Sequence, residues 1–283
     1  MVAAMMASSN LYNLLMRRLS VPIQQGLSVG LHPMGSAAQE QASRAAPCDA
    51  SDHSYESLLM TAAQKHILHV QLKGPDKRNA MNKAFWREMV ECFIKIAQDS
   101  KCRAVVISGA GKTFTSGIDL MEWLQTCCSL KGTMWPASAD TCMTSSADTS
   151  VIKKCPKLVI AAVHWGCVQA GHAVFQVKEV NVGLAADVGT LQWLPKSIRN
   201  QSLVNELAFT AGKMMVDEAL SSGLVIHVFP DKWLLLDAAF ALAAEIASKS
   251  PVAMQSTKIN LLYSCDRPVS EGLNYMATWN MSM

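Results

Sequence analysis

The chain has 283 residues, and 25 lysines and arginines against 22 acidic residues give it a formal net charge of +3. Hydrophobic residues make up 50% of the chain, which is enough for a sizeable core and excludes wholesale disorder, while the near-balanced charge does not favour nucleic acid as a partner. The nine cysteines form no C-x-x-C pair and are odd in number, so reduced and mostly buried thiols are expected rather than a disulfide framework.

Residues 1–53 differ in composition from the rest of the chain. No acidic residue precedes Glu40, serine and glutamine are frequent, and Leu11, Leu14, Leu15 and Arg18 follow helical spacing. This composition is typical of a mitochondrial transit peptide, and an ordinary disordered tail is the alternative. We therefore expect a leader over 1–53, a folded domain over 54–283 and the mitochondrial matrix as the location.

Apolar patterning predicts a strand over 66–72, a helix over 84–99 capped by Asn82, and a buried strand over 104–109. Residues 158–177 are uncharged and long enough for a membrane helix, but their histidines, glutamines and glycines favour a buried strand over 158–163 followed by a turn. We expect no transmembrane segment. From about residue 200 the pattern predicts helices over 200–210, 217–222, 232–248 and 251–263.

The strand, helix and strand with continuous apolar strands indicate an α/β fold with crossover connections. The segment 133–150 interrupts this pattern, because it is rich in serine and threonine and has no apolar period. Such a stretch inside a compact domain is a flexible lid, an insertion or the product of a shifted reading frame.

Two glycine-containing turns follow predicted strands. In residues 109–120 the small Ser116 and Gly117 let backbone N–H groups approach a ligand closely. The spacing of a P-loop is absent there, which excludes a nucleotide triphosphatase. Residues 166–171 form the second turn, and one N–H from each turn would make an oxyanion hole. Taken singly, each turn is as readily structural.

Two carboxylates stand out in residues 175–190. Asp187 is surrounded by uncharged residues, and a carboxylate in apolar surroundings has a raised pKa that suits proton exchange near neutrality. Glu179 would be its partner if both flank one substrate. The structural alternative places Glu179 on a strand edge beside Lys178 and makes Asp187 the cap of a helix that begins at Val188.

In this order and spacing, the motifs resemble the enoyl-CoA hydratase/isomerase (crotonase) superfamily, and within it the isomerases of dienoyl-CoA thioesters. The resemblance runs from about residue 54 to the end and is carried by four stretches, namely Lys77-Arg78-Asn79-Ala80-Met81, 114–120, 175–190 and 205–210. It implies an α/β fold, a spiral of ββα units with a C-terminal helical region that is incomplete here. It also implies trimers or pairs of trimers, and an acyl-CoA thioester as substrate.

The activity implied by the resemblance converts a 3,5-dienoyl-CoA into a 2,4-dienoyl-CoA in fatty-acid β-oxidation. Asp187 matches the base that removes the C2 proton, and Glu179 matches the donor that protonates C6. Ser116 and Ala170 would supply the two oxyanion N–H groups. No metal and no cofactor are implied, because coenzyme A is part of the substrate. The expected CoA-binding residues are Lys77, Arg78, Ala80, Ser116, Gly117, Ile118, Asp119, Leu120 and Ala170.

The sequence also departs from the superfamily pattern. After Gly171 a helix and a strand of that pattern are missing, and Ala173 stands near the place of a third carboxylate. The family continues beyond the position of Met283, and residues 281–283 are not a peroxisomal signal, although some members carry one. A catalytically impaired CoA-thioester-binding relative is therefore the alternative function. Hydratase activity is disfavoured because only Glu179 matches the glutamates it needs, and no basic stripe supports RNA binding.

Overall fold

The computed structural model describes residues 53–122, 125, 150–164, 173–186 and 188–282. The leader expected over 1–53, apart from His53, lies outside these residues. So do most of the 133–150 segment, the 166–171 turn with Ala170, and Asp187.

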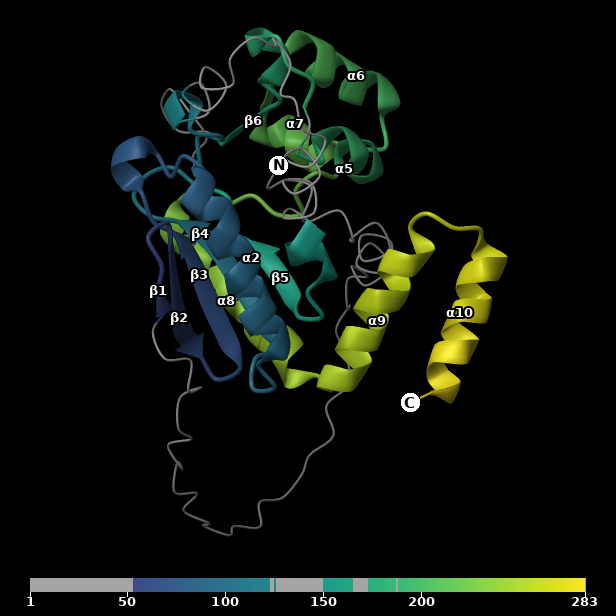
Figure 1. Cartoon of the computed structure of the whole chain (residues 1–283). Coiled ribbons are helices and arrows are strands. Elements are labelled where there is room, and N and C mark those ends of the chain that lie inside the picture. The colour runs from purple at the N-terminus through teal and green to yellow at the C-terminus, as the bar shows by residue number, and fades with distance from the viewer. Residues whose placement is uncertain (1–52, 123–124, 126–149, 165–172, 187, 283) are drawn as a thin grey trace, which may run out of the picture.

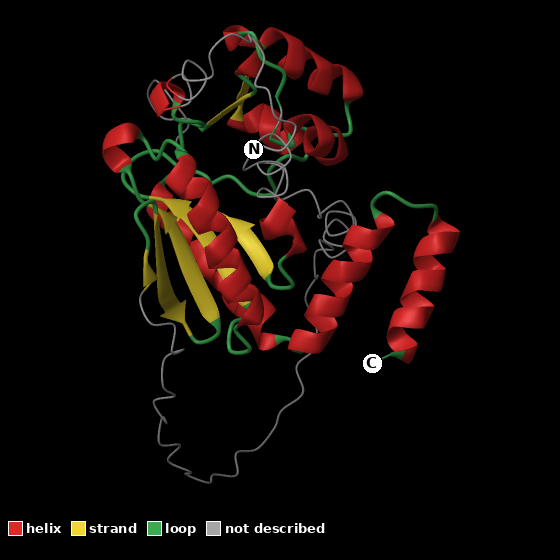
Figure 2. Cartoon of the chain, in the orientation of Figure 1, coloured by secondary structure: helices red, strands yellow, loops and turns green. Residues whose placement is uncertain are grey.

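A five-stranded sheet forms the centre of the molecule (Figures 1 and 2). Its first three strands pair antiparallel, and the last two join in parallel. Parallel strands end at one edge, so the segments that follow β3, β4 and β5 meet there. The order in the sheet follows the chain, with β1 (His53–Ser54), β2 (Leu58–Gln64), β3 (Ile67–Leu72), β4 (Ala104–Gly109) and β5 (Leu158–Ala161).

Helix α2 (Lys83–Gln98) covers one face of the sheet and α8 (Lys232–Ser248) covers the other (Figure 1). Strand β4 is buried throughout, as its mostly apolar sequence predicted. Its side chains alternate between the two cores, with Val105 and Ile107 facing α2 and Ala104 and Val106 facing α8. Helix α8 meets the sheet through the small residues Ala239, Ala243 and Ala247.

The start of α2 confirms the expected cap, because Asn82 Oδ1 accepts a hydrogen bond from the Phe85 N–H at 2.8 Å. The helix buries a single face against the sheet. Burial raises the pKa of the Cys92 thiol on that face to about 12, so this cysteine is protonated at neutral pH. Among the described cysteines the expectation of buried thiols holds for Cys92, Cys102 and Cys155, but Cys265 is exposed.

A smaller unit lies beyond the carboxyl edge of the sheet (Figure 1). It has its own core, which includes Leu194, Val204 and Met214. Its α5 begins at Thr190 with Gly189 as N-cap, not at Val188 as the capping alternative supposed. The unit contains a two-stranded antiparallel sheet and short helices, namely β6 (Val174–Gln176), η3 (Glu179–Val182), α5 (Thr190–Ser197), α6 (Gln201–Thr210), β7 (Lys213–Met215) and α7 (Val216–Ser221).

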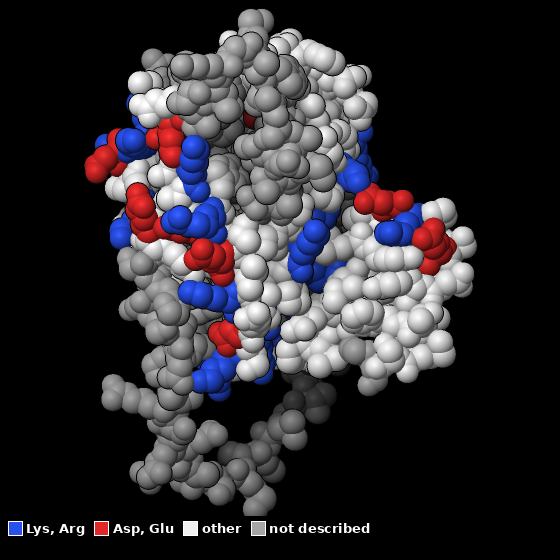
Figure 3. Space-filling model, in the orientation of Figure 1, with Lys and Arg blue, Asp and Glu red and all other residues white. Residues whose placement is uncertain are grey.

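The last two helices, α9 (Pro251–Ser264) and α10 (Val269–Met281), form a hairpin at the side of the molecule (Figure 1). Tyr263 and Tyr275 stack between them with ring centroids 3.7 Å apart. Large apolar side chains of α10 remain exposed, and in Figure 3 the hairpin presents a mostly uncharged surface. Within the described part of the chain, no helix combines the length and the apolar character that crossing a membrane requires.

Helix α9 buries the side chain of a lysine, Lys258. Lys258 Nζ donates to the Lys157 carbonyl oxygen at 2.6 Å, and burial lowers the pKa of Lys258 to about 8. An unfolded lysine titrates near pH 10.4, so between about pH 8 and 10 the unfolded chain binds more protons and the free energy of unfolding rises with pH. From pH 7.5 to 9.5, we expect wild type to gain about 2 kcal/mol of stability relative to Lys258→Met.

Urea denaturation followed by circular dichroism at the two pH values measures this difference. Lys154→Met is the matched control, because Lys154 is exposed and its variant should track wild type across the range. A difference between wild type and Lys258→Met that does not change with pH would contradict the assignment.

Candidate active site

The site expected from the sequence lies where β3 and β4 end. After β3 the chain forms η2 (Pro75–Lys77), and the next two residues, Arg78 and Asn79, both adopt left-handed backbone conformations, with φ of 54° and 53°. Asparagine is among the few non-glycine residues that tolerate this conformation. The two residues turn the chain sharply, so that Ala80 and Met81 run alongside the segment that follows β4.

The Asn79 side chain joins the two turns. Its Nδ2 lies 2.9, 2.7 and 3.1 Å from the carbonyl oxygens of Ala110, Thr113 and Phe114. Asn79 is buried, and it gives partners to turn carbonyl groups that are not paired within a helix or sheet. Asn79 is therefore the member of the motif at residues 77–81 that holds the two turns together. The sequence did not predict this role for it.

The segment 114–120 pairs with Met81 like a short parallel strand. The Met81 N–H donates to the Gly117 carbonyl at 2.8 Å, and the Asp119 N–H donates to the Met81 carbonyl at 3.0 Å. Because successive N–H groups of a strand point to opposite sides, the Ile118 N–H points away from Met81. The structure gives the Ile118 N–H no acceptor among the described residues.

This pairing corrects one prediction. The Ser116 N–H, expected as the first oxyanion donor, already donates to the Arg78 carbonyl at 2.9 Å. The Gly117 N–H is also engaged, by Thr115 Oγ1 at 3.1 Å. The Ile118 N–H is the donor in this stretch that stays available for a ligand. The second expected donor, on Ala170, lies outside the described residues.

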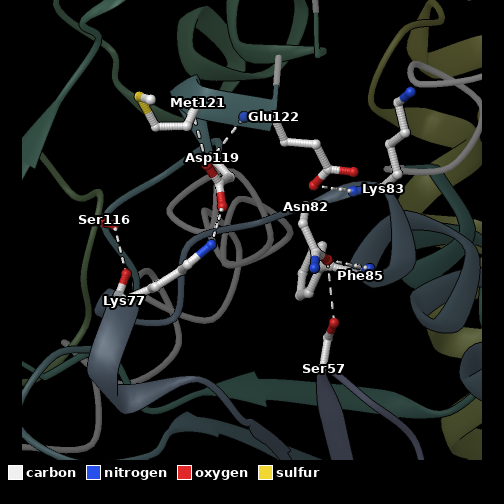
Figure 4. A network of polar contacts seen from close by, with 9 residues as sticks. All are labelled: Ser57, Lys77, Asn82, Lys83, Phe85, Ser116, Asp119, Met121 and Glu122. Carbon is white, nitrogen blue, oxygen red and sulfur yellow. Dashed lines mark hydrogen bonds and ion pairs between the residues drawn. The ribbon is translucent and has the colours of Figure 1, made fainter. Parts of the chain in front are cut away.

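Asp119 was expected to line the CoA site, but its carboxylate serves the local structure (Figure 4). One oxygen accepts from the N–H groups of Met121 and Glu122 at 3.1 and 3.3 Å and so caps the helical turn that starts at residue 120. The other oxygen accepts from Lys77 Nζ at 3.2 Å. The hydrogen bond from Lys77, followed by that from Glu122, lowers the pKa of Asp119.

We expect Asp119→Ala to cost about 1 kcal/mol at pH 7, because the cap is lost. Asp119→Asn keeps a capping oxygen and loses only an ion pair whose lysine is 77% exposed, so it should stay within about 0.5 kcal/mol of wild type. Since the folded-state pKa is depressed, the carboxylate's contribution is present above about pH 4 and is lost as the pH falls through that pKa. Urea denaturation at pH 7 and pH 3 checks this, and equal costs for both variants would contradict it.

None of the other predicted CoA-binding residues that the structure describes is buried. Ser116 and Leu120 are exposed, whereas Ala80 and Ile118 are half-buried. Gly117 has a φ of 94°, and apart from its two chain neighbours no described residue has an atom within 4 Å of the position that a Cβ would take there. The backbone at 116–118 is therefore open to a close approach by a ligand, as its small residues suggested.

Glu179 begins η3 in the smaller unit, not a strand edge. Its side chain is half-buried, and the structure gives its carboxylate no hydrogen bond or ion pair with a described residue. Among the described residues, the Glu179 carboxylate is therefore not held as a structural carboxylate such as Glu88 is by the N–H groups of Glu56 and Ser57. Asp187, its predicted partner, lies outside the described residues.

Two further residues support the turn after β4 and were missed by the sequence analysis. His164, three residues after the end of β5, has Nδ1 3.2 Å from the Lys112 carbonyl and Nε2 3.0 Å from the Gly109 carbonyl. Lys232, at the start of α8, donates to the carbonyls of Gly109 and Gly111 at 3.0 and 2.7 Å. A histidine directly after an all-apolar strand is a detectable signal, but nothing local marks Lys232.

Known proteins resemble this chain in both sequence and fold. Residues 62–279 match the family described as enoyl-CoA hydratase/isomerase. Proteins named Delta(3,5)-Delta(2,4)-dienoyl-CoA isomerase, mitochondrial, from Pongo abelii and Homo sapiens are each 61% identical to it, over all of this chain and 92% of their own length. Each of these alignments spans 302 residues, which exceeds the 283 residues of this chain, so these isomerases have positions that it lacks.

The fold agrees with this relationship. An enoyl-CoA hydratase structure from Bacillus anthracis superposes with a TM-score of 0.70 at 23% identity, covering 80% of this chain and 90% of that one. The mixed α/β architecture with C-terminal helices is thus confirmed as the crotonase fold. The chain belongs to the enoyl-CoA hydratase/isomerase family.

Proposed function

We propose that the chain is a dienoyl-CoA isomerase that converts 3,5-dienoyl-CoA into 2,4-dienoyl-CoA in fatty-acid β-oxidation. The observation that carries this proposal is identity of 57–61% along the whole chain to four mammalian isomerases of that name. The site geometry supports it. Among the described residues, the Ile118 N–H has no acceptor and the Glu179 carboxylate has no hydrogen-bond or ion-pair partner.

In the proposed mechanism, Asp187 removes the proton from C2 of the thioester as that C–H bond breaks. The electron pair spreads over the conjugated chain to the thioester oxygen and gives a dienolate. Glu179 then delivers a proton to C6, and the double bonds shift from 3,5 to 2,4. One proton leaves and one arrives, so no oxidant or cofactor is consumed. Each positioned acid or base of this kind contributes about 10²- to 10⁴-fold to the rate.

We assign the first oxyanion donor to the Ile118 N–H instead of Ser116. The dienolate concentrates negative charge on the thioester oxygen, and a preorganised donor stabilises that charge more than it stabilises the substrate carbonyl. Within residues 116–118, the Ser116 and Gly117 N–H groups have acceptors, whereas the Ile118 N–H has none among the described residues. The open side of Gly117 leaves room for the thioester beside it.

The test is an isomerisation assay of the purified full chain with a 3,5-dienoyl-CoA substrate, followed by the ultraviolet absorbance of the product. We expect conversion to the 2,4-dienoyl thioester well above the uncatalysed rate. An enzyme preparation that is folded by circular dichroism but gives no conversion would contradict the isomerase function.

A second candidate is a relative that binds CoA thioesters without turnover. The observation that favours it is the set of isomerase positions that this chain lacks, which the sequence predicts to follow Gly171 and to include a helix and a third carboxylate. Calorimetric titration with a saturated acyl-CoA separates the two candidates when read beside the assay. Binding without conversion would favour the second.

The location and assembly follow from the same relationship. We propose import into the mitochondrial matrix, supported by the acid-poor composition of residues 1–53 and by relatives whose names specify mitochondria. We also propose a homotrimer or a pair of trimers, because α10 leaves Val269, Leu273 and Met281 between 65% and 81% exposed. Sedimentation equilibrium of the purified chain tests the assembly, and a monomer at micromolar concentration would contradict it.

A further inference from the structure

The turn between β4 and the site segment is held by side chains from three distant parts of the chain. Every backbone carbonyl from Gly109 to Phe114 lies within hydrogen-bonding distance of Asn79, His164 or Lys232. A turn has no ladder of its own, so these side chains supply the partners that its carbonyl groups need. The turn leads directly into residues 114–120.

The two histidine contacts do not suffice for this turn. Burial, together with the nearby charge of Lys232, lowers the pKa of His164, so the ring is neutral near pH 7 and has one N–H. The tautomer with the proton on Nδ1 donates to the Lys112 carbonyl and lets Nε2 accept from the Gly109 N–H, which lies 3.3 Å away. In that state the Gly109 carbonyl receives no hydrogen from His164.

Lys232 supplies the missing donor. Its ammonium group donates to the Gly109 carbonyl at 3.0 Å and to the Gly111 carbonyl at 2.7 Å, from 123 and 121 positions along the chain. A charged donor makes stronger hydrogen bonds than a neutral one. Since Lys232 is the first residue of α8, it ties the turn to the helix that covers the back of the sheet.

Two backbone hydrogen bonds connect the position of the turn to the position of the site segment. The Phe114 N–H donates to the His164 carbonyl at 2.8 Å, and two residues later the Ser116 N–H donates to the Arg78 carbonyl. Together these contacts set where the chain enters residues 116–118. A displaced turn would therefore displace the Ile118 N–H.

We infer that Lys232 is a positioning residue, which holds the Gly109–Phe114 turn so that residues 116–118 present their backbone to the thioester. The part concerning the thioester rests on the proposed isomerase function. Lys232 Nζ contacts the Gly109 and Gly111 carbonyl oxygens of the turn, so the role inferred for it is positioning and not catalysis.

The experiment compares wild type, Lys232→Met and Lys232→Arg as full chains, by hydrogen–deuterium exchange at a temperature where all are folded. Lys232→Met should speed amide exchange in peptides covering residues 109–120 by about tenfold or more, while peptides from α10 are unchanged. Lys232→Arg should restore most of the protection, since a guanidinium also donates to two carbonyls. The control is Lys249→Met at the other end of α8, where the exposed side chain has no hydrogen bond or ion pair among the described residues.

The same proteins are then assayed for isomerisation. Lys232→Met should lower kcat by about tenfold or more and change KM less than about threefold. A displaced N–H donor stabilises the negatively charged transition state less, and this loss is larger than the loss of substrate binding. Unchanged exchange in 109–120 would overturn the inference, and so would faster exchange with kcat and KM both at wild-type values. A wild type that is folded but inactive would contradict the proposed function instead. The exchange comparison alone would then show whether Lys232 holds the turn in place.

Discussion

Glu179→Gln is expected to lower the rate of isomerisation by about 10³-fold, with little change in KM. Glutamine keeps the size and polarity of the side chain but has no proton to deliver to C6, so it removes the acid without removing its contacts. Asp187→Asn should have a similar effect, because amide oxygen is too weak a base for the C2 proton. The measurement is steady-state kinetics with a 3,5-dienoyl-CoA, at equal thermal stability of the variants.

The control for this pair is Glu206→Gln in α6. Glu206 is exposed, and the hydrogen bond from Thr210 Oγ1 goes to its backbone carbonyl and not to its carboxylate. It should retain wild-type kinetics. A Glu179→Gln variant whose rate lies within about fivefold of wild type would show that Glu179 is not the proton donor, since a general acid contributes at least about a hundredfold to the rate.

Gly109→Ala is expected to destabilise the chain by about 3 kcal/mol, because the added methyl group has no space. A Cβ at this position would lie 2.5 Å from the carbonyl oxygens of both Thr113 and Phe114. These are backbone atoms of the turn that enters the site, so the clash is relieved only by moving the turn. The free energy of unfolding from urea denaturation measures the effect.

Gly74→Ala is the matched control. It lies in the turn after β3, where an added Cβ would lie 3.8 Å from Asn79 Cα in ordinary contact, on a backbone with the extended φ of 175°. We expect a change of less than about 1 kcal/mol there. Equal effects at the two glycines would mean that the turn after β4 is not tightly constrained.

The parts of the fold that were predictable are those with a strong local signal. Strand β4 is apolar at nearly every position, and α2 combines a capping asparagine with a regular apolar face. Helix α10 lacks such a signal, because its apolar side chains are exposed and only Gly272 is buried. Its position depends on stacking against α9, which local patterning does not reveal.

Some features of the candidate site were likewise predictable from the sequence, and others were not. The motif residues were brought together as expected, since Lys77 to Met81 lie along residues 114–120. Which backbone N–H stays available was not predictable, because it depends on the pairing of Ser116 with Arg78 across the fold. The role of Lys232 was not predictable either, since it donates to a turn more than a hundred residues away in the sequence.

The most direct test of the central claim is the reaction of a 3,5-dienoyl-CoA with the full chain in deuterium oxide, with the product analysed by nuclear magnetic resonance. The proposed mechanism predicts a 2,4-dienoyl-CoA that carries deuterium at C6, because the carboxyl group that protonates C6 exchanges its proton with the solvent. Recovery of unchanged 3,5-dienoyl-CoA from folded protein, or a product hydrated at the double bond, would contradict the isomerase account.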